Sequence, residues 1–102
     1  MRRYTTPTHE LTVVDADLSG CDVYVSYKQG SRTREVMVEP VLEGEDTHLS
    51  VPWTQEETAL FNEGMLQVQV NWITPEGLRT ATEVGQVQVG PNLLAREVEF
   101  GG

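Results

Sequence analysis

Residues 65–73, which read MLQVQVNWI, decide the fold. Apolar side chains alternate with amides along this stretch: Leu66, Val68, Val70 and Trp72 share one parity, and Gln67, Gln69 and Asn71 share the other. Successive side chains of a strand point to opposite faces, so the alternation predicts a strand with one buried and one exposed face. Such strands are typical of antiparallel sheets that pack one face on a core.

A turn and a return strand are expected directly after this stretch. Residues 74–77 (TPEG) place Pro second and Gly fourth, as a tight turn prefers. Over residues 78–89 the apolar parity is even up to Val84 and odd from Val87, and the change falls at Gly85. A one-residue change of parity predicts either a β-bulge or a strand that crosses between two sheets.

Further short strands are expected upstream, at residues 11–13, 21–28, 33–38 and 48–51. Residues 21–28 alternate most cleanly, with Cys21, Val23, Val25 and Tyr27 on one face. Valine is the dominant stiff apolar residue of the chain, and β-branched side chains fit a pleated surface better than a helix.

One short helix is expected at about residues 54–63. Thr54 is followed three residues later by Glu57, the pattern of a capping box at a helix N-terminus. Leu60 and Phe61 supply an apolar side, and Gly64 is expected to end the helix as a left-handed cap.

Together these elements predict an all-β protein with an immunoglobulin-like antiparallel β-sandwich and one inserted helix. The length fits a single domain over residues 1–102, with residues 1–8 and 93–102 as loosely ordered arms. A small barrel is the alternative architecture. The arm from Leu93 onward is either ordered by a neighbouring molecule or disordered.

The charge balance narrows the choice of partners. The chain has 16 acidic and 7 basic residues, a net charge of -9, and Lys28 is its single lysine. Nucleic acids and anionic membranes require clustered cations, so neither is expected as a partner, whereas a basic patch on another protein is compatible. Residues 4–10 are too polar for a signal peptide, so synthesis in a bacterial cytoplasm is expected.

No sequence motif indicates a catalytic or metal-binding site. Residues 15–20 (DADLSG) match the opening of a calcium loop, but its twelfth position is Ser26 instead of Glu, so a polar turn is expected. His9 and His48 stand alone, and Cys21 is expected to be a buried, inert thiol. We therefore expect no metal, no cofactor and no enzymatic activity.

Aromatic and amide side chains supply the candidates for a binding surface. Tyr27 and Trp72 lie on apolar faces and are expected in the core, whereas Tyr24 and Trp53 are candidates for exposed binding residues. The amide stripe is either a plain exposed face or a surface that pairs with a neighbouring subunit. Its members are Gln67, Gln69, Asn71, Gln86 and Gln88.

Several segments resemble one group of proteins. The matching segments are residues 17–20 (DLSG), 23–25 (VYV), 53–61 (WTQEETALF), 66–72 (LQVQVNW), 77–83 (GLRTATE) and 87–89 (VQV), together with Gly64. They are similar to small structural proteins of tailed phages and prophages of gut bacteria, and they resemble the immunoglobulin-like N-terminal domain of phage baseplate upper proteins. The resemblance implies a virion-associated module that docks onto other proteins, and it brings no catalytic residues.

Two functions follow as hypotheses. The first is a non-enzymatic virion structural protein of the tail, neck or baseplate that docks onto other virion proteins or onto itself. The second is a carbohydrate-binding adhesion module, which a groove exposing both Tyr24 and Trp53 would favour.

Overall fold

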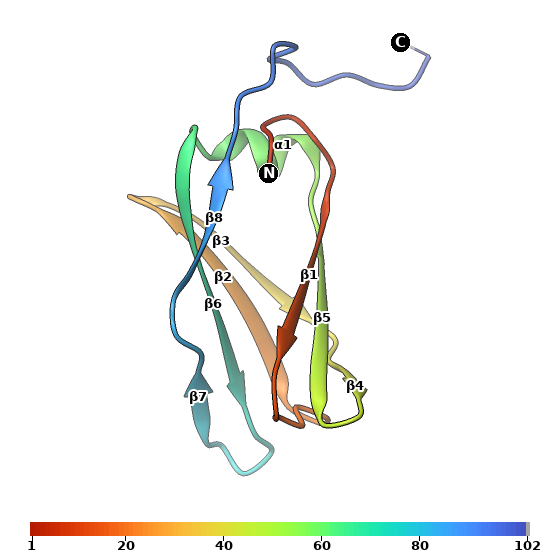
Figure 1. The fold of residues 1–102 in the computed structure, drawn as a ribbon, viewed down its shortest axis with the longest axis vertical. Helices are drawn as coiled ribbons and strands as arrows, with labels where there is room; N and C mark the ends of the chain where they lie inside the picture. Colours follow the sequence, from red (N-terminus) through yellow and green to blue (C-terminus); the bar gives the residue numbers. More distant parts are fainter. Residues whose placement is uncertain (102) are drawn as a thin grey trace.

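The computed structural model describes residues 1–101 and consists of two antiparallel sheets packed against each other, with one short helix (Figure 1). The elements in chain order are β1 (Thr8–Val13), β2 (Asp22–Gln29), β3 (Arg32–Val38), β4 (Val41–Glu43), β5 (Asp46–Pro52), α1 (Gln55–Leu60), β6 (Gly64–Ile73), β7 (Arg79–Ala81) and β8 (Gly85–Val89). The prediction of an all-β sandwich with one inserted helix is confirmed.

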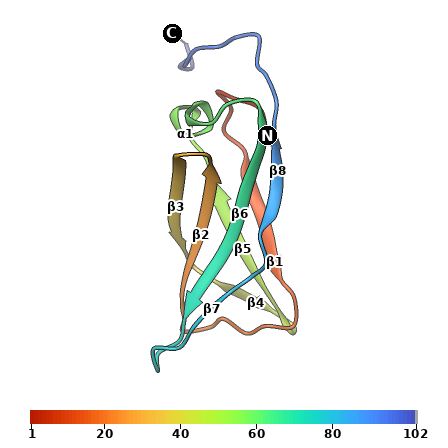
Figure 2. The ribbon, with the colours of Figure 1, turned by 90° about the vertical axis from the view of Figure 1, so that its left-hand side faces the viewer.

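The strand order is that of an immunoglobulin-like sandwich. The three-stranded sheet has the order β1-β5-β4, and the five-stranded sheet has the order β3-β2-β6, after which both β7 and β8 pair with β6. Figure 2 looks onto the larger sheet, where β3, β2 and β6 lie side by side. With β1 as the second strand of the immunoglobulin scheme, the two sheets correspond to its B-E-D and C′-C-F-G sheets.

The core lies between the inner faces of the two sheets. Val25 pairs with Val70 and Tyr27 with Val68 across β2 and β6, so the alternating apolar residues of both strands point inward together. The buried apolar residues are Leu18, Val23, Val25, Tyr27, Leu49, Val51, Trp53, Phe61, Leu66, Val70 and Val89. Their contribution to stability comes from apolar area removed from water, at roughly 25 cal/mol per Å².

The return strand contains the β-bulge that the parity change predicted. Asn71 faces Ala81 while Val68 faces Gly85, so the return strand carries one residue more than β6 between these pairs. Thr82 secures the junction: its backbone N–H donates to the Val70 carbonyl at 2.9 Å, and its hydroxyl accepts from the Val70 N–H at 3.1 Å. The alternative of a strand crossing between sheets is wrong, because β7 and β8 both pair with β6.

Helix α1 begins as predicted and ends earlier. The Thr54 hydroxyl accepts from the Glu57 N–H at 3.2 Å, and the Glu57 carboxylate accepts from the Thr54 N–H at 2.9 Å, which completes the capping box. The helix stops at Leu60 because Phe61 is already extended and fully buried. Gly64 is therefore not its cap but the first residue of β6, with φ of 123°.

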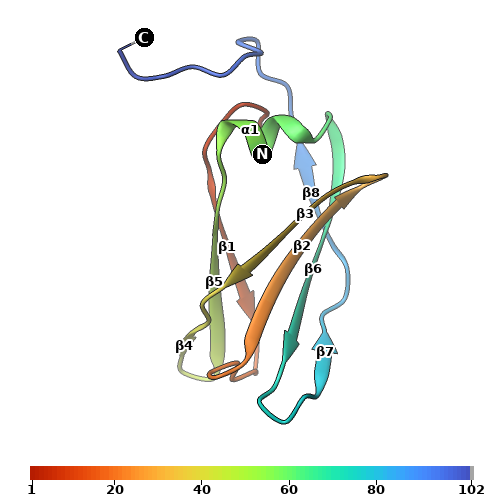
Figure 3. The ribbon, with the colours of Figure 1, turned by 180° about the vertical axis from the view of Figure 1, so that it is seen from behind.

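The two ends of the chain lie at the same end of the sandwich as α1 (Figure 3). Arg2 forms a parallel bridge with Gly90, and the Arg3 guanidinium donates to the carbonyls of Phe61 and Ala59, both at 2.8 Å. The start of residues 1–8 is thus tied to the sandwich instead of forming a loose arm. Residues 93–101 form no strand and run outward above α1, and Gly102 lies outside the described residues.

Candidate functional site

The candidate site is the outer face of the larger sheet. Register places Tyr24 beside Asn71 and Ser26 beside Gln69 across β2 and β6. The same face continues onto β8, where the stripe residues oppose β6. The pairs there are Gln67 with Gln86 and Met65 with Gln88. All predicted surface residues except Trp53 therefore share one face of one sheet.

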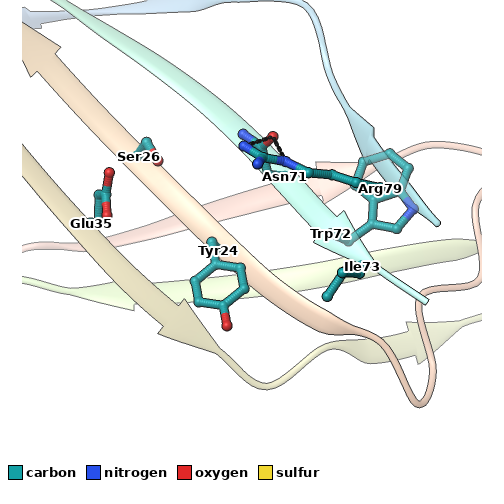
Figure 4. Close-up of a pocket in the computed structure, with 7 residues that line it drawn as sticks. All are labelled: Tyr24, Ser26, Glu35, Asn71, Trp72, Ile73 and Arg79. Atoms are coloured by element: carbon teal, nitrogen blue, oxygen red, sulfur yellow. Dashed lines mark hydrogen bonds between the residues drawn. The ribbon is translucent and has the colours of Figure 1, made fainter. Parts of the chain in front are cut away.

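A hollow of about 270 Å³ lies at one end of this face (Figure 4). Its lining residues come from β2, β3, β6 and β7, because the pairing of these strands places their outward side chains next to one another. The lining residues are Tyr24, Ser26, Glu35, Asn71, Trp72, Ile73 and Arg79. Most small-molecule and side-chain binding sites are concavities that combine an apolar surface with a few polar groups, and this hollow has that character.

Polar groups in the hollow are held in fixed positions. The side-chain Oδ1 of Asn71 accepts from the Arg79 guanidinium at 3.2 and 3.3 Å, which joins β6 to β7 on the outer face. Within residues 1–101 Arg34 forms an ion pair with Glu57, and His48 Nε2 lies 3.1 Å from the Glu43 carboxylate. Glu35 takes part in neither contact, so it keeps its carboxylate for another partner. A cation, an anion and an amide thus line one small concavity.

Tyr24 is the exposed aromatic of this face, with 40% of its surface accessible. Its hydroxyl-bearing ring lies over the sheet between β3 and β6, as Figure 4 shows. Exposed Tyr is frequent at binding surfaces because its ring supplies contact area and its hydroxyl supplies a hydrogen bond.

Trp53 is not a surface residue, and its prediction as a binding candidate is wrong. It is only 3% exposed, and its indole N–H donates to His9 Nδ1 at 3.2 Å. Its ring packs edge-on against Tyr27 with 4.7 Å between centroids. The chain turns inward after β5, so Trp53 closes the core beneath α1. The pair of exposed aromatics that would favour a sugar platform is therefore reduced to Tyr24.

The other two aromatics are close to expectation. Tyr27 is fully buried, and burial raises the pKa of its phenol to about 12. Trp72 is half-buried, and it also reaches the lining of the outer hollow.

A polar cluster beneath α1 holds this end of the sandwich together. Burial lowers the pKa of His9, and nearby positive charge, including that of Arg34, lowers it further. Burial alone would raise the pKa of Glu57, but the hydrogen bond from the Thr54 N–H and the charge of Arg34 outweigh it, so the net shift is downward. The cluster is structural in character: Arg34 donates to Glu57 and the Trp53 N–H donates to His9, while Arg34 Nη1 is buried without a hydrogen-bond partner among residues 1–101.

The turn at residues 15–20 is the polar turn expected from the failed calcium pattern. The Asp17 carboxylate accepts from the Ser19 N–H at 2.9 Å, and Leu18 is buried with its N–H donating to the Thr47 hydroxyl. Within residues 1–101 no three or more His, Cys, Asp and Glu side chains gather in a way that could hold a metal ion. Cys21 is half-buried, less than expected.

Sequence reasoning missed the charged members of the hollow. Arg79 lies opposite Ile73 and Glu35 opposite Ser26, so the register drawn from the turn at residues 74–77 would have placed Arg79, and that drawn from the turn between β2 and β3 would have placed Glu35. None of the helices within residues 1–101 is long and apolar enough to cross a membrane.

Comparison with known proteins gives the fold and little more. No family model matches the chain, and no curated protein matches it. Among solved structures, an uncharacterized protein from Listeria monocytogenes EGD-e, crystallised with α-D-glucose, β-D-glucose, magnesium and calcium, matches with a TM-score of 0.57 and 14% identity. The match covers 86% of this chain and 8% of the Listeria chain, so it shows a shared fold alone.

Proposed function

We propose that this protein is a non-enzymatic docking module of a phage or prophage virion, and that it binds other virion proteins through the outer face of its larger sheet. The observation that carries the proposal is the make-up of that face. Tyr24 and the amides of Gln67, Gln69 and Asn71 lie together on adjacent strands of a rigid sheet.

This make-up suits a protein partner. The centres of protein interfaces are depleted in charge and enriched in Tyr and Met, whereas charges gather at the rim. Here Met37, which is 57% exposed, lies directly opposite Tyr24, and Lys28 borders the amides at the other end. Arg79 and Glu35 supply charges of both signs, which favour one orientation of a partner.

Assignment to a virion rests on the sequence resemblance to phage structural proteins. The matching motifs include residues 66–72 and 77–83, which form β6 and the strand beside it, so they coincide with the proposed docking face. The tail, neck or baseplate is the proposed location, and the partners are virion proteins, including further copies of this chain. The net charge of -9 supports protein partners over nucleic acid.

Carbohydrate binding is the second candidate, and the hollow favours it. An exposed Tyr24 ring beside the Asn71 amide and the Glu35 carboxylate offers stacking and hydrogen bonds of the kind that sugars use. The burial of Trp53 removes the second aromatic of the expected platform. The Listeria protein was solved with glucose, but the shared segment is too small a part of it to locate any sugar site.

The test is quantitative mass spectrometry of virions purified on a density gradient after induction of the bacterium that carries the gene. The protein is expected in a fixed copy number relative to a tail protein, and its absence from purified particles would refute the virion assignment. A glycan array probed with the intact protein tests the second candidate. Saturable binding to one glycan class that Tyr24→Ala abolishes would favour that candidate.

A further inference from the structure

The C-terminal arm, residues 93–100, exposes four large apolar side chains to water. Leu93 is 103% exposed and Phe100 109%, and Leu94 and Val98 are 50% and 38% exposed. In all three views the arm leaves the sandwich and runs outward above α1. Clustered apolar side chains left in water mark interaction sites in soluble proteins.

The arm has the pattern of a strand with one apolar face. Val98 and Phe100 share the parity of Leu94 and Arg96, whereas Glu97 and Glu99 share that of Leu93 and Ala95, so apolar and acidic residues alternate strictly from Glu97 to Phe100. Its backbone is already bound as a strand would be on one edge. The Gln55 side-chain amide donates to the Val98 carbonyl at 2.6 Å and accepts from the Val98 N–H at 2.8 Å.

The opposite edge of the arm is left for another strand. In an extended chain the N–H and C=O of one residue point to the same edge, and those of its two neighbours point to the other. Because Val98 faces Gln55, the backbone groups of Glu97 and Glu99 in an extended arm face away from α1. The Glu97 carbonyl accepts there from the guanidinium of the adjacent Arg96 at 3.4 Å, an exposed bond that a pairing strand would replace. The arm can therefore pair with a second chain without giving up its contact with Gln55.

Strand β1 offers a matching edge. It pairs with β5 on one side, and within residues 1–101 no strand pairs with its other side. Glu10 is its one acidic or basic residue other than His9, so its edge lacks most of the charges that prevent pairing. By contrast, the outer edge of β3 carries Arg32, Arg34 and Glu35 and is protected.

An apolar hollow of about 210 Å³ lies beside this edge, between β1 and the bulge of the return strand. A strand added to β1 would place every second side chain toward this space. The hollow is lined by Leu11, Thr12, Val13, Val68, Gln69, Val70, Thr82, Glu83 and Gly85.

We propose that the C-terminal arm of one copy adds as an extra strand to the free edge of β1 in a second copy. The side of the arm that carries Leu94, Val98 and Phe100 then faces the open edge of the core, where one of these side chains fills the hollow, and Arg96 on the same side is placed to pair with Glu83. The acceptor is a second copy because Gln55 holds the arm over the α1 of its own chain. Strand addition of this kind takes its affinity from main-chain hydrogen bonds and its specificity from pockets for alternate side chains.

The proposal is independent of docking through the outer sheet face, because it uses a different strand and a different hollow. Its test is the oligomeric state of the full chain, measured by size exclusion with light scattering over a concentration series. The double variant Val98→Asp, Phe100→Asp changes only exposed arm residues, so its sandwich is expected to fold normally. The matched control is Leu78→Asp, since Leu78 is 68% exposed and lies away from both the arm and β1.

The wild type is expected to associate, and the double variant is expected to raise the dissociation constant at least about tenfold, equivalent to about 1.4 kcal/mol. The control is expected to associate like the wild type. Hydrogen exchange of the same proteins locates the contact: amides of β1 and of the arm should become protected together as the wild-type concentration rises. A wild type that stays monomeric at every concentration overturns the proposal, and so does an oligomer whose β1 amides stay unprotected.

Discussion

The guanidinium carbon of Arg34 lies 4.4 Å from the centre of the Trp53 ring. The same guanidinium donates to the Glu57 carboxylate at 2.8 Å and to the Pro52 carbonyl at 2.9 Å. Arg34 thus joins β3 of the larger sheet to β5 of the smaller one and to α1. Its guanidinium lies over the indole ring and covers it, which explains why Trp53 is part of the core.

Replacing Arg34 tests this connection. We expect Arg34→Met to lower the free energy of unfolding by about 2 kcal/mol, because a charge-assisted hydrogen bond and a cation–π contact are lost. Arg34→Lys should recover part of the loss, since an ammonium keeps the charge but not the planar fork. Urea unfolding followed by Trp fluorescence measures both variants, and a stability equal to that of the wild type in Arg34→Met would contradict the assigned role.

Glu57 makes stability depend on acidic pH. Its pKa is lowered in the folded protein, so its stabilising effect is present above its unfolded pKa of 4.5 and is lost as the pH falls through the lower folded pKa. We expect the difference in unfolding free energy between the wild type and Glu57→Gln to shrink as the pH is lowered from 6 to 3. Denaturant unfolding at several pH values measures this, and a constant difference would show that Glu57 does not titrate as described.

His9 makes stability depend on pH near neutrality. The Trp53 N–H can only donate, so His9 Nδ1 accepts and the ring is neutral. Because burial lowers the pKa of His9 below 6.5, the unfolded chain binds the proton first, and stability falls as the pH drops below 6.5. We expect His9→Gln to flatten the pH dependence of the thermal midpoint just below pH 6.5. An unchanged slope would contradict neutral burial of His9.

Thr82 is expected to stabilise the bulge in the return strand. Its hydroxyl accepts from the Val70 N–H and donates to the Glu83 carbonyl. Thr82→Val keeps the shape of the side chain but leaves the half-buried Val70 N–H without this acceptor, so we expect a loss of about 1–2 kcal/mol. Thr80→Val, on an exposed position of β7, is the matched control. Equal stability of both variants would show that the hydroxyl is dispensable.

The parts of the fold that depend on residues adjacent to one another in the sequence were predictable. Alternation placed β2, β3 and β6, the capping box placed the start of α1, and the parity change at Gly85 located the bulge. Strand β4 was missed because its three residues are all exposed and show no alternation. Gly64 was wrongly predicted to cap the helix. The helix ends earlier because Phe61 is extended and buried in the core.

The candidate site was predictable only in part. The face that carries Tyr24 and the amide stripe followed from side-chain parity, which is a local property. The burial of Trp53 depends on His9, Tyr27 and Arg34, which lie far away in the sequence, and no local pattern records them. The charges of the hollow, Arg79 and Glu35, depend on the register between strands.

The outer face of the larger sheet is the centre of this account, and a face-directed variant tests it most directly. Tyr24→Arg, on an exposed position, should leave stability within about 0.5 kcal/mol of the wild type. The measurement is the copy number of each protein in gradient-purified virions, by mass spectrometry, with Val41→Arg on the exposed face of the smaller sheet as control. We predict that the wild type and Val41→Arg are incorporated and that Tyr24→Arg is not. Incorporation of Tyr24→Arg at the wild-type level would contradict docking through this face.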